Sequence, residues 1–211
     1  MLAKLFGRLR TIQRLELTNE NSSIRFANNV ELHCHKTSKI SIGGVVRIGY
    51  ALPGVGDFPS YNKSVIYLGE NATFTVYGNL FIAPGCSIRV GDGASLQFDG
   101  ENYIAHNLAV LCARQIRIGE GASISWGVTL IDDDRHEFRL ANGKTYRRIY
   151  RPLIIGKNAG IQMGVTIPRG VNVGANSIIS ANTVLRNDVP ENCLAYQKLG
   201  LELRDGICTK F

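Results

Sequence analysis

The fold of this chain is decided by residues 155–189, which read IGKNAGIQMGVTIPRGVNVGANSIISANTVLRNDV. Every sixth position from Ile155 holds a large aliphatic residue, namely Ile155, Ile161, Ile167, Val173, Ile179 and Leu185. Four positions after each of them stands a small or β-branched residue: Ala159, Val165, Val171, Ser177, Thr183 and Val189. An α-helix would repeat apolar residues at three and four positions, and a half-buried strand at two. A period of six instead predicts stacked coils with flat faces of short parallel strand, the larger residue filling a face and the smaller one lying at a corner.

A second pattern, an aliphatic residue followed by Gly and then by a small residue three positions on, occurs five times. Its copies begin at Leu68, Val90, Ile118, Ile155 and Val173. We interpret them as marks of successive coils. The last two copies are three hexads apart, which predicts a three-sided prism. Longer spacings predict loops that leave the stack, the longest of them between Ile118 and Ile155, with an irregular part over 131–153.

The two ends of the chain follow the repeat less well. Within residues 2–17, apolar residues recur near helical spacing with Lys and Arg between them, which predicts an amphipathic helix. Such a helix either packs on the stack or lies on a membrane surface. The predicted organisation is therefore a helical segment over 1–20, a β-helix over 21–195 with its loop at 131–153, and a tail over 196–211. A Pro- and Gly-rich stretch at 50–61 predicts a further loop.

Composition limits the partners and the compartment. The formal net charge of +7 favours anionic partners, but no nucleic-acid-binding module is recognisable, so we expect no nucleic acid. The five cysteines show no C-x-x-C spacing and are expected to be buried in a reducing compartment. No apolar run is long enough to span a membrane, and no signal peptide is recognisable. We expect a cytoplasmic protein, with the inner face of the membrane as the alternative if residues 2–17 bind lipid.

Three features together resemble the hexapeptide-repeat acyltransferases, and in particular the galactoside and maltose acetyltransferases and the polysaccharide O-acetyltransferases. They are the hexads, the segment HEFRLANGKTY at His136–Tyr146, and the closing segment VLRNDVP at Val184–Pro190. The resemblance covers roughly residues 65–195. It implies an all-β, left-handed parallel β-helix, a homotrimer with sites between subunits, and transfer of an acetyl group from acetyl-CoA to a hydroxyl of a sugar or glycan. N-acetylation of an amino sugar nucleotide and a non-catalytic scaffold stay open.

The resemblance assigns the general base to His136. A sugar hydroxyl is a poor nucleophile near neutral pH, and a neutral imidazole can accept its proton as the oxygen attacks a thioester. The neighbouring acidic residues could orient the ring, and we choose Asp134 for that role. The alternative is that the acidic run is simply a solvated loop.

The remaining site residues are also carried over from the resemblance. Asn107 corresponds to a position near the acceptor, although it is equally well explained as a corner residue. His106 stands beside it, and we expect it to line the same cleft. Two departures from the family pattern are Gly160, where a tryptophan is usual, and residues 196–199, where GNPA is usual. The predicted contacts to coenzyme A are Gly160, Met163, Ala181, Arg186 and Asn187.

A metal-dependent carbonic anhydrase on the same fold would need three histidines around zinc. The close pair His33 and His35 lies far along the chain from His106 and His136. We therefore expect no metal.

Overall fold

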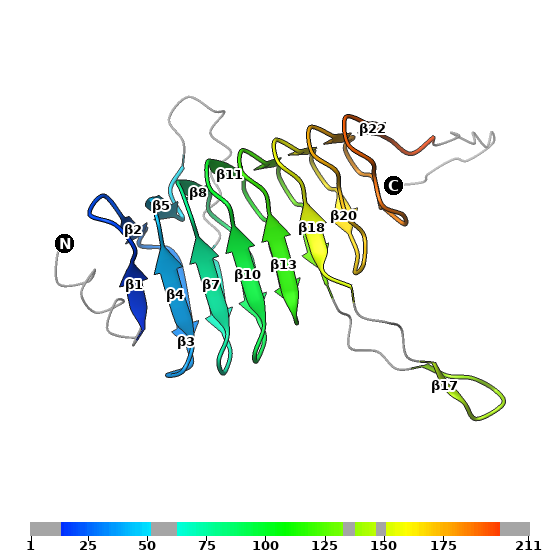
Figure 1. Ribbon diagram of the computed structural model, residues 1–211, viewed down its shortest axis with the longest axis horizontal. Helices are drawn as coiled ribbons and strands as arrows, with labels where there is room; N and C mark the ends of the chain where they lie inside the picture. Colours follow the sequence, from blue (N-terminus) through cyan, green and yellow to red (C-terminus); the bar gives the residue numbers. More distant parts are fainter. Residues whose placement is uncertain (1–13, 52–62, 133–137, 147–150, 199–211) are drawn as a thin grey trace, which may run out of the picture.

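The computed structural model describes residues 14–51, 63–132, 138–146 and 151–198. In these residues the chain forms short strands and no helix, and it winds into a three-sided prism (Figure 1). The turns of the chain build three parallel sheets, which we call sheets A, B and C, and the last turns add strands to sheet B but only isolated bridges to sheets A and C. The predicted all-β, left-handed parallel β-helix is confirmed.

Sheet A, facing the viewer in Figure 1, contains β1 (Leu15–Leu17), β4 (Lys39–Ile42), β7 (Thr73–Val76), β10 (Ser95–Phe98), β13 (Gln115–Ile118) and β18 (Leu153–Ile155). Sheet B contains β2 (Ser23–Phe26), β5 (Val45–Ile48), β8 (Leu80–Ile82), β11 (Asn102–Ile104), β14 (Ser123–Ile124), β19 (Gly160–Ile161), β21 (Ile178–Ile179) and β22 (Leu194–Ala195). Sheet C contains β3 (Val30–Cys34), β6 (Ser64–Leu68), β9 (Ser87–Val90), β12 (Ala109–Cys112), β15 (Thr129–Ile131) and β20 (Thr166–Ile167). The chain runs from A to B to C in each turn, so the prism has an A–B, a B–C and a C–A corner.

The hexad residues form the core of the prism. All twelve of the large and small positions named above are buried, and Ile155, Ile167 and Ile179 are fully enclosed. Because side chains alternate along a strand, each short strand points one to three residues inward and the rest outward. Stacked coils join these inward residues into one continuous apolar column, which no single coil could bury alone.

The prism is wider at its N-terminal end than at its C-terminal end. One turn takes 22 residues between Glu70 and Asp92, 18 between Asn158 and Asn176, and 16 between Asn176 and Asn192. The extra residues of the early coils lengthen their strands to four residues in β7, β9 and β10. The prediction that every longer spacing marks a protruding loop is therefore wrong for these coils, since the added length enlarges the faces.

The five copies of the Gly-containing pattern do not mark successive coils. Leu68 and Val90 end strands of sheet C, whereas Ile118, Ile155 and Val173 lie in or beside sheet A. The first two copies therefore turn the C–A corner, and the last three turn the A–B corner. The interpretation fails because the pattern suits any corner at which a strand ends and the next coil approaches closely.

The A–B corner of the last coils is held by a ladder of asparagines. Asn158, Asn176 and Asn192 all adopt left-handed backbone conformations, with φ of 56°, 58° and 58°. The side-chain amide of Asn158 donates to Asn176 at 3.3 Å, and that of Asn176 donates to Asn192 at 3.1 Å. Asparagine tolerates this conformation better than most residues, so one residue type serves both the turn and the ladder.

The predicted long loop leaves the stack between β15 and β18 and projects from the prism in Figure 1. Its described part is a hairpin in which β16 (Phe138–Arg139) pairs antiparallel with β17 (Thr145–Tyr146). The connecting turn is closed by the Leu140 amide, which donates to the Lys144 carbonyl at 2.8 Å, and by Gly143 at a φ of 78°. The described part of the loop is therefore a β-hairpin, and the chain rejoins the stack at β18.

The predicted N-terminal helix is wrong where the structure describes it. Residues 15–17 form β1, which pairs with β4, because Leu15 continues the inward column of the stack. Residues 1–13, most of the loop predicted over 50–61, and Cys208 lie outside the described residues. Of the other cysteines, Cys86 and Cys112 are buried as predicted, while Cys34 and Cys193 are half-buried. Across the described ranges, no helix is long and apolar enough to cross a membrane.

Candidate functional site

The B–C corner brings together site residues that are distant in sequence. After β8, β11, β14 and β19 of sheet B the chain turns through a residue whose carbonyl accepts a hydrogen bond from the next coil. These bonds run from Asn107 to Pro84, from Gly127 to His106, from Gly164 to Trp126 and from Asn182 to Met163, at 2.7–3.2 Å. His106, Met163 and Ala181, predicted for two different ligands, therefore belong to one stacked column.

Asn107 stands one position further along this corner, with a φ of 62°. The same turn position is held by a glycine or asparagine in the neighbouring coils, at Gly85, Gly127, Gly164 and Asn182, all with positive φ. The local geometry therefore explains an asparagine here without any ligand. Its predicted contact with an acceptor stays a prediction.

His106, unlike Asn107, is not explained by the geometry of the corner. Its side chain is 9% exposed, and its Nδ1 atom has no hydrogen-bond partner among the described residues. Leaving a buried polar atom unpaired costs about 1–3 kcal/mol, which the fold of a plain corner would not require. The predicted role of His106 near the acceptor stays a prediction.

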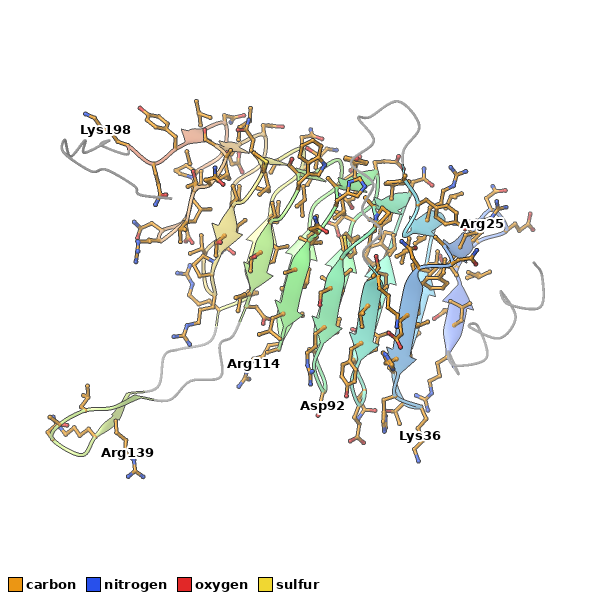
Figure 2. All side chains as sticks on the ribbon, turned by 180° about the vertical axis from the view of Figure 1, so that it is seen from behind. Arg25, Lys36, Asp92, Arg114, Arg139 and Lys198 are labelled. Carbon is orange, nitrogen blue, oxygen red and sulfur yellow. The ribbon has the colours of Figure 1, made fainter. Side chains whose placement is uncertain are left out.

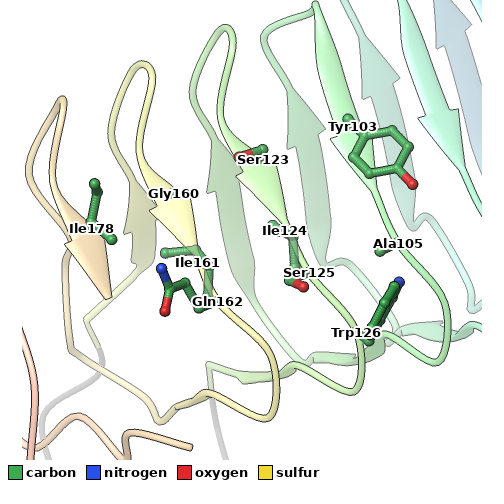
Figure 3. Close-up of a pocket in the computed structure, with 10 residues that line it drawn as sticks. All are labelled: Tyr103, Ala105, Ser123, Ile124, Ser125, Trp126, Gly160, Ile161, Gln162 and Ile178. Carbon is green, nitrogen blue, oxygen red and sulfur yellow. The ribbon is translucent and has the colours of Figure 1, made fainter. Parts of the chain in front are cut away.

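A groove of about 350 Å³ opens on the outer face of sheet B beside this column (Figure 3). Buried Ile124 and Ile161 form its floor, and Tyr103, Trp126 and Ile178 stand around it. Burial raises the pKa of the Tyr103 hydroxyl. Polar groups at the rim come from Ser123, Ser125 and Gln162.

Gly160 is the reason the groove is open. It pairs with Ser123 on one side and Ile178 on the other, so its side-chain position faces the groove. A Cβ at Gly160 would meet only the Ile178 Cγ1 atom, at 3.7 Å, and the φ of Gly160 is outside the left-handed range. Neither backbone conformation nor crowding demands glycine here, so the missing side chain mainly creates space.

The C–A corner holds the other predicted cofactor residues. Arg186 and Asn187 lie there, across sheet C from Met163 and Ala181. The corner also carries Arg114, Arg151 and Arg169 in other coils, and Arg114 marks this edge of the prism in Figure 2. The Arg151 guanidinium contacts the Asp188 carboxylate at 3.0 Å. The predicted cofactor set is therefore divided among sheet B, the B–C corner and the C–A corner of the last coils.

The loop predicted to carry the catalytic base leaves the prism at this same C–A corner. His136 and Asp134 lie outside the described residues, so their arrangement stays a prediction. Asp132, the last residue before them, is described and is 1% exposed. The sequence drew attention to Asp132 only as one of an acidic run, and it did not single out Trp126 or Tyr103 at all. The signal available for Trp126 was that it is the one tryptophan of the chain.

The histidines weighed for zinc lie apart. His33 is exposed on β3 and contacts Glu31 at 3.4 Å, and the His35 Nδ1 atom is 2.8 Å from the Thr37 hydroxyl. Neither is near His106 in the stack, and the part of the chain that is described contains no group of three metal-binding side chains.

Comparison with known proteins agrees with this architecture. No family model matches the chain. It is 32% identical over 125 residues to a galactoside O-acetyltransferase of Escherichia coli K12, covering 57% of this chain and 58% of that protein. It is 36% identical over 111 residues to a putative acetyltransferase of Saccharomyces cerevisiae, covering 49% of this chain and 53% of that protein. The chain thus spans little more than half the length of these curated relatives.

The predicted resemblance to the hexapeptide-repeat acyltransferases is confirmed. Among solved structures, the polySia specific acetyltransferase NeuO superposes on the chain with a TM-score of 0.54 at 16% identity, covering 88% of this chain and 91% of NeuO. That likeness extends the agreement in fold to nearly the whole described prism.

Proposed function

We propose that this protein is a coenzyme-A-dependent acetyltransferase that acetylates a hydroxyl group of a sugar or glycan. The observation that carries the proposal is that the predicted catalytic loop and a row of arginines share the C–A corner. The His136 loop leaves the prism there, and four arginines of successive coils, Arg114, Arg151, Arg169 and Arg186, lie along it. Stacked coils are about 4.8 Å apart, so these arginines suit the phosphate groups of a coenzyme A held close to the loop.

In the proposed reaction the neutral imidazole of His136 accepts the hydroxyl proton of the acceptor. The acceptor oxygen bonds to the thioester carbonyl carbon, the carbon–sulfur bond breaks, and the coenzyme A thiolate leaves and takes up a proton. No covalent enzyme intermediate is needed if both substrates are bound together, because proximity supplies much of the rate. Asp134 orients the imidazole, and His106 and Asn107 contact the acceptor in this proposal.

The donor is proposed to contact Gly160, Met163, Ala181, Arg186 and Asn187. Since these residues lie on sheet B and on two corners of one chain, a single prism face would leave the donor open to water. We therefore propose a homotrimer in which a neighbouring subunit covers the site. Light scattering at micromolar protein checks this assembly, and a monomer mass would contradict it.

The activity is tested by measuring coenzyme A release from acetyl-CoA with a panel of sugars, nucleotide sugars and glycans. His136→Ala should lower turnover by roughly two to four orders of magnitude, the range for loss of a general base. His33→Ala is the matched control, because His33 is an exposed histidine of the early coils. The wild-type rate should also fall as the pH drops, since only the neutral imidazole accepts a proton.

The competing functions give different results in the same assay. An O-acetyl product is an ester that mild alkali cleaves, whereas an N-acetyl product from an amino sugar nucleotide survives the treatment. A non-catalytic scaffold would release no coenzyme A with any acceptor. If His136→Ala keeps more than about a tenth of wild-type turnover, the general-base assignment is wrong.

A further inference from the structure

We propose that Asp132 is a positioning residue that fixes the base of the His136 loop, an inference that rests on the function proposed above. The carboxylate of Asp132 accepts hydrogen bonds from three consecutive backbone amides of the preceding coil. The Ala113 amide donates to Oδ1 at 2.6 Å, and the amides of Arg114 and Gln115 donate to Oδ2 at 2.8 Å and 2.6 Å. The Cys112 thiol lies 3.7 Å from the same Oδ2 atom.

Asp132 occupies a position that belongs to the core in other coils. Ile131 pairs with Leu111, so Asp132 continues the inward column formed by Leu68, Val90 and Cys112. An apolar side chain would be the ordinary choice in that column. Burying a carboxylate is costly unless its charge is compensated by hydrogen bonds, and the three amides provide that compensation.

The three amides need an acceptor because the corner beneath the loop is unusually short. Only Ala113 and Arg114 separate β12 from β13, whereas four residues separate β9 from β10. In the longer corner the Ala94 amide donates to the Gly91 carbonyl, and the Gly91 amide to the Cys112 carbonyl. Among the described residues we find no such turn bond within the short corner, and the chain departs into the loop directly above it. The Asp132 carboxylate therefore closes the short corner and ties the departing chain to it.

This tie fixes the point at which the chain leaves the prism. Asp132 is the last described residue before the loop, and it is bonded to the corner that Arg114 marks in Figure 2. Errors of about 1 Å in the placement of a catalytic group can cost on the order of 100-fold in rate. A loosened anchor would thus reduce turnover even if the base itself were unchanged.

Asp132→Asn tests the inference, because asparagine has the same shape but presents an NH2 group to amide donors. We expect turnover to fall by roughly 10- to 100-fold. The KM for acetyl-CoA should change much less, because only Arg114 of the four proposed phosphate-binding arginines is bonded to Asp132. Asp99→Asn is the matched control. Asp99 is also a paired carboxylate, but its partner is the Arg117 side chain at 2.9 Å on sheet A. The assay is run at a temperature where circular dichroism shows each variant folded.

Hydrogen exchange of the amides at residues 113–115 provides a readout that does not depend on activity. These amides should be protected in the wild type and exchange at least tenfold faster in Asp132→Asn. If Asp132→Asn does not fold, Asp132→Glu retains the charge and should show a smaller loss of turnover. If the wild-type protein transfers no acetyl group, the proposed function is wrong. Protection of the amides of residues 113–115 from exchange would still show that the Asp132 carboxylate closes this corner. A folded Asp132→Asn with wild-type turnover, or unprotected wild-type amides, would overturn this inference.

Discussion

The early and late coils of the prism both enclose an apolar core, but the early coils use more residues per turn. Around β7 and β10, turns of 22 residues enclose the rings of Phe74 and Phe98, whose centroids are 5.6 Å apart. Beyond β18, turns of 18 and 16 residues enclose aliphatic side chains such as Val173. The late coils use two-residue strands or single bridges in place of four-residue strands.

The difference explains where the hexad pattern is visible. Between Ile155 and Val173 each face has six residues, enough to turn a corner and point one large side chain inward. The late coils have no spare residues, so their sequence repeats strictly, whereas the early coils fill a wider interior with larger residues and vary their spacing. The predicted donor residues Gly160, Met163, Ala181, Arg186 and Asn187 all lie in the late coils. We therefore expect the early coils to tolerate loss of volume poorly and the late coils to tolerate added volume poorly.

The largest effect is expected from truncating the wide interior. Phe98→Ala should lower the free energy of unfolding by about 3–5 kcal/mol, because Phe98 is fully buried against Phe74 and leaves a large cavity. Val173→Ala in the late coils removes two methyl groups and should cost only about 1.5 kcal/mol. Denaturant titrations of both variants at one protein concentration measure the difference. Equal losses would contradict the division into a wide and a narrow interior.

A smaller effect is expected from adding volume to the late coils. In Gly156→Ala the new Cβ would lie 2.5 Å from the Ala175 backbone nitrogen, which cannot swing aside, and we expect a loss of about 1–3 kcal/mol. Gly160→Ala is the matched control in the same coil, since its Cβ would meet Ile178 at an ordinary 3.7 Å. Its unfolding free energy should stay within about 0.5 kcal/mol of wild type. Comparable losses in the two variants would show that Gly160 is needed for packing and does not simply open the groove.

The smallest effect concerns alkaline pH and the early coils. Burial raises the pKa of the Cys34 and Cys86 thiols from 9.0 to about 11. The unfolded chain therefore releases these protons at lower pH than the folded chain, so their stabilisation is complete below pH 9 and is lost as the pH rises towards 11. For Cys86 the loss between pH 7 and 10 should be about 1 kcal/mol.

Cys86→Ala isolates this contribution. Between pH 7 and pH 10 its unfolding free energy should fall by about 1 kcal/mol less than that of the wild type, as measured by denaturant titration at both values. Lysine and tyrosine titrate equally in both proteins and cancel in the difference. Parallel pH profiles would mean that the folded protein does not raise the pKa of this thiol.

Much of the fold was open to prediction because the rule behind it is local. Alternation along each strand decides which side chains point inward, and the corner residue is small because the next coil approaches closely. Both constraints act within six residues. The hexad pattern between Ile155 and Val189 therefore predicted correctly which of its residues are buried. The predicted N-terminal helix is wrong at residues 15–17 because Leu15 satisfies two periods at once, and only its pairing with Ile40 of β4 decides between them.

Which residues meet at the candidate site depends on the number of residues in each turn of the prism, and no local sequence pattern gives that number. The chain takes 22 residues per turn in one place and 16 in another, so the same Gly-containing pattern turns the C–A corner at Val90 and the A–B corner at Ile118. His106 and Met163 share a column, and the Asp132 carboxylate meets the Ala113 amide, only because the coils between them add up to that register. The sequence determined by itself that the chain would coil and which residues would face inward. The tertiary structure alone decided which outward residues meet, since that depends on the accumulated length of every turn in the stack.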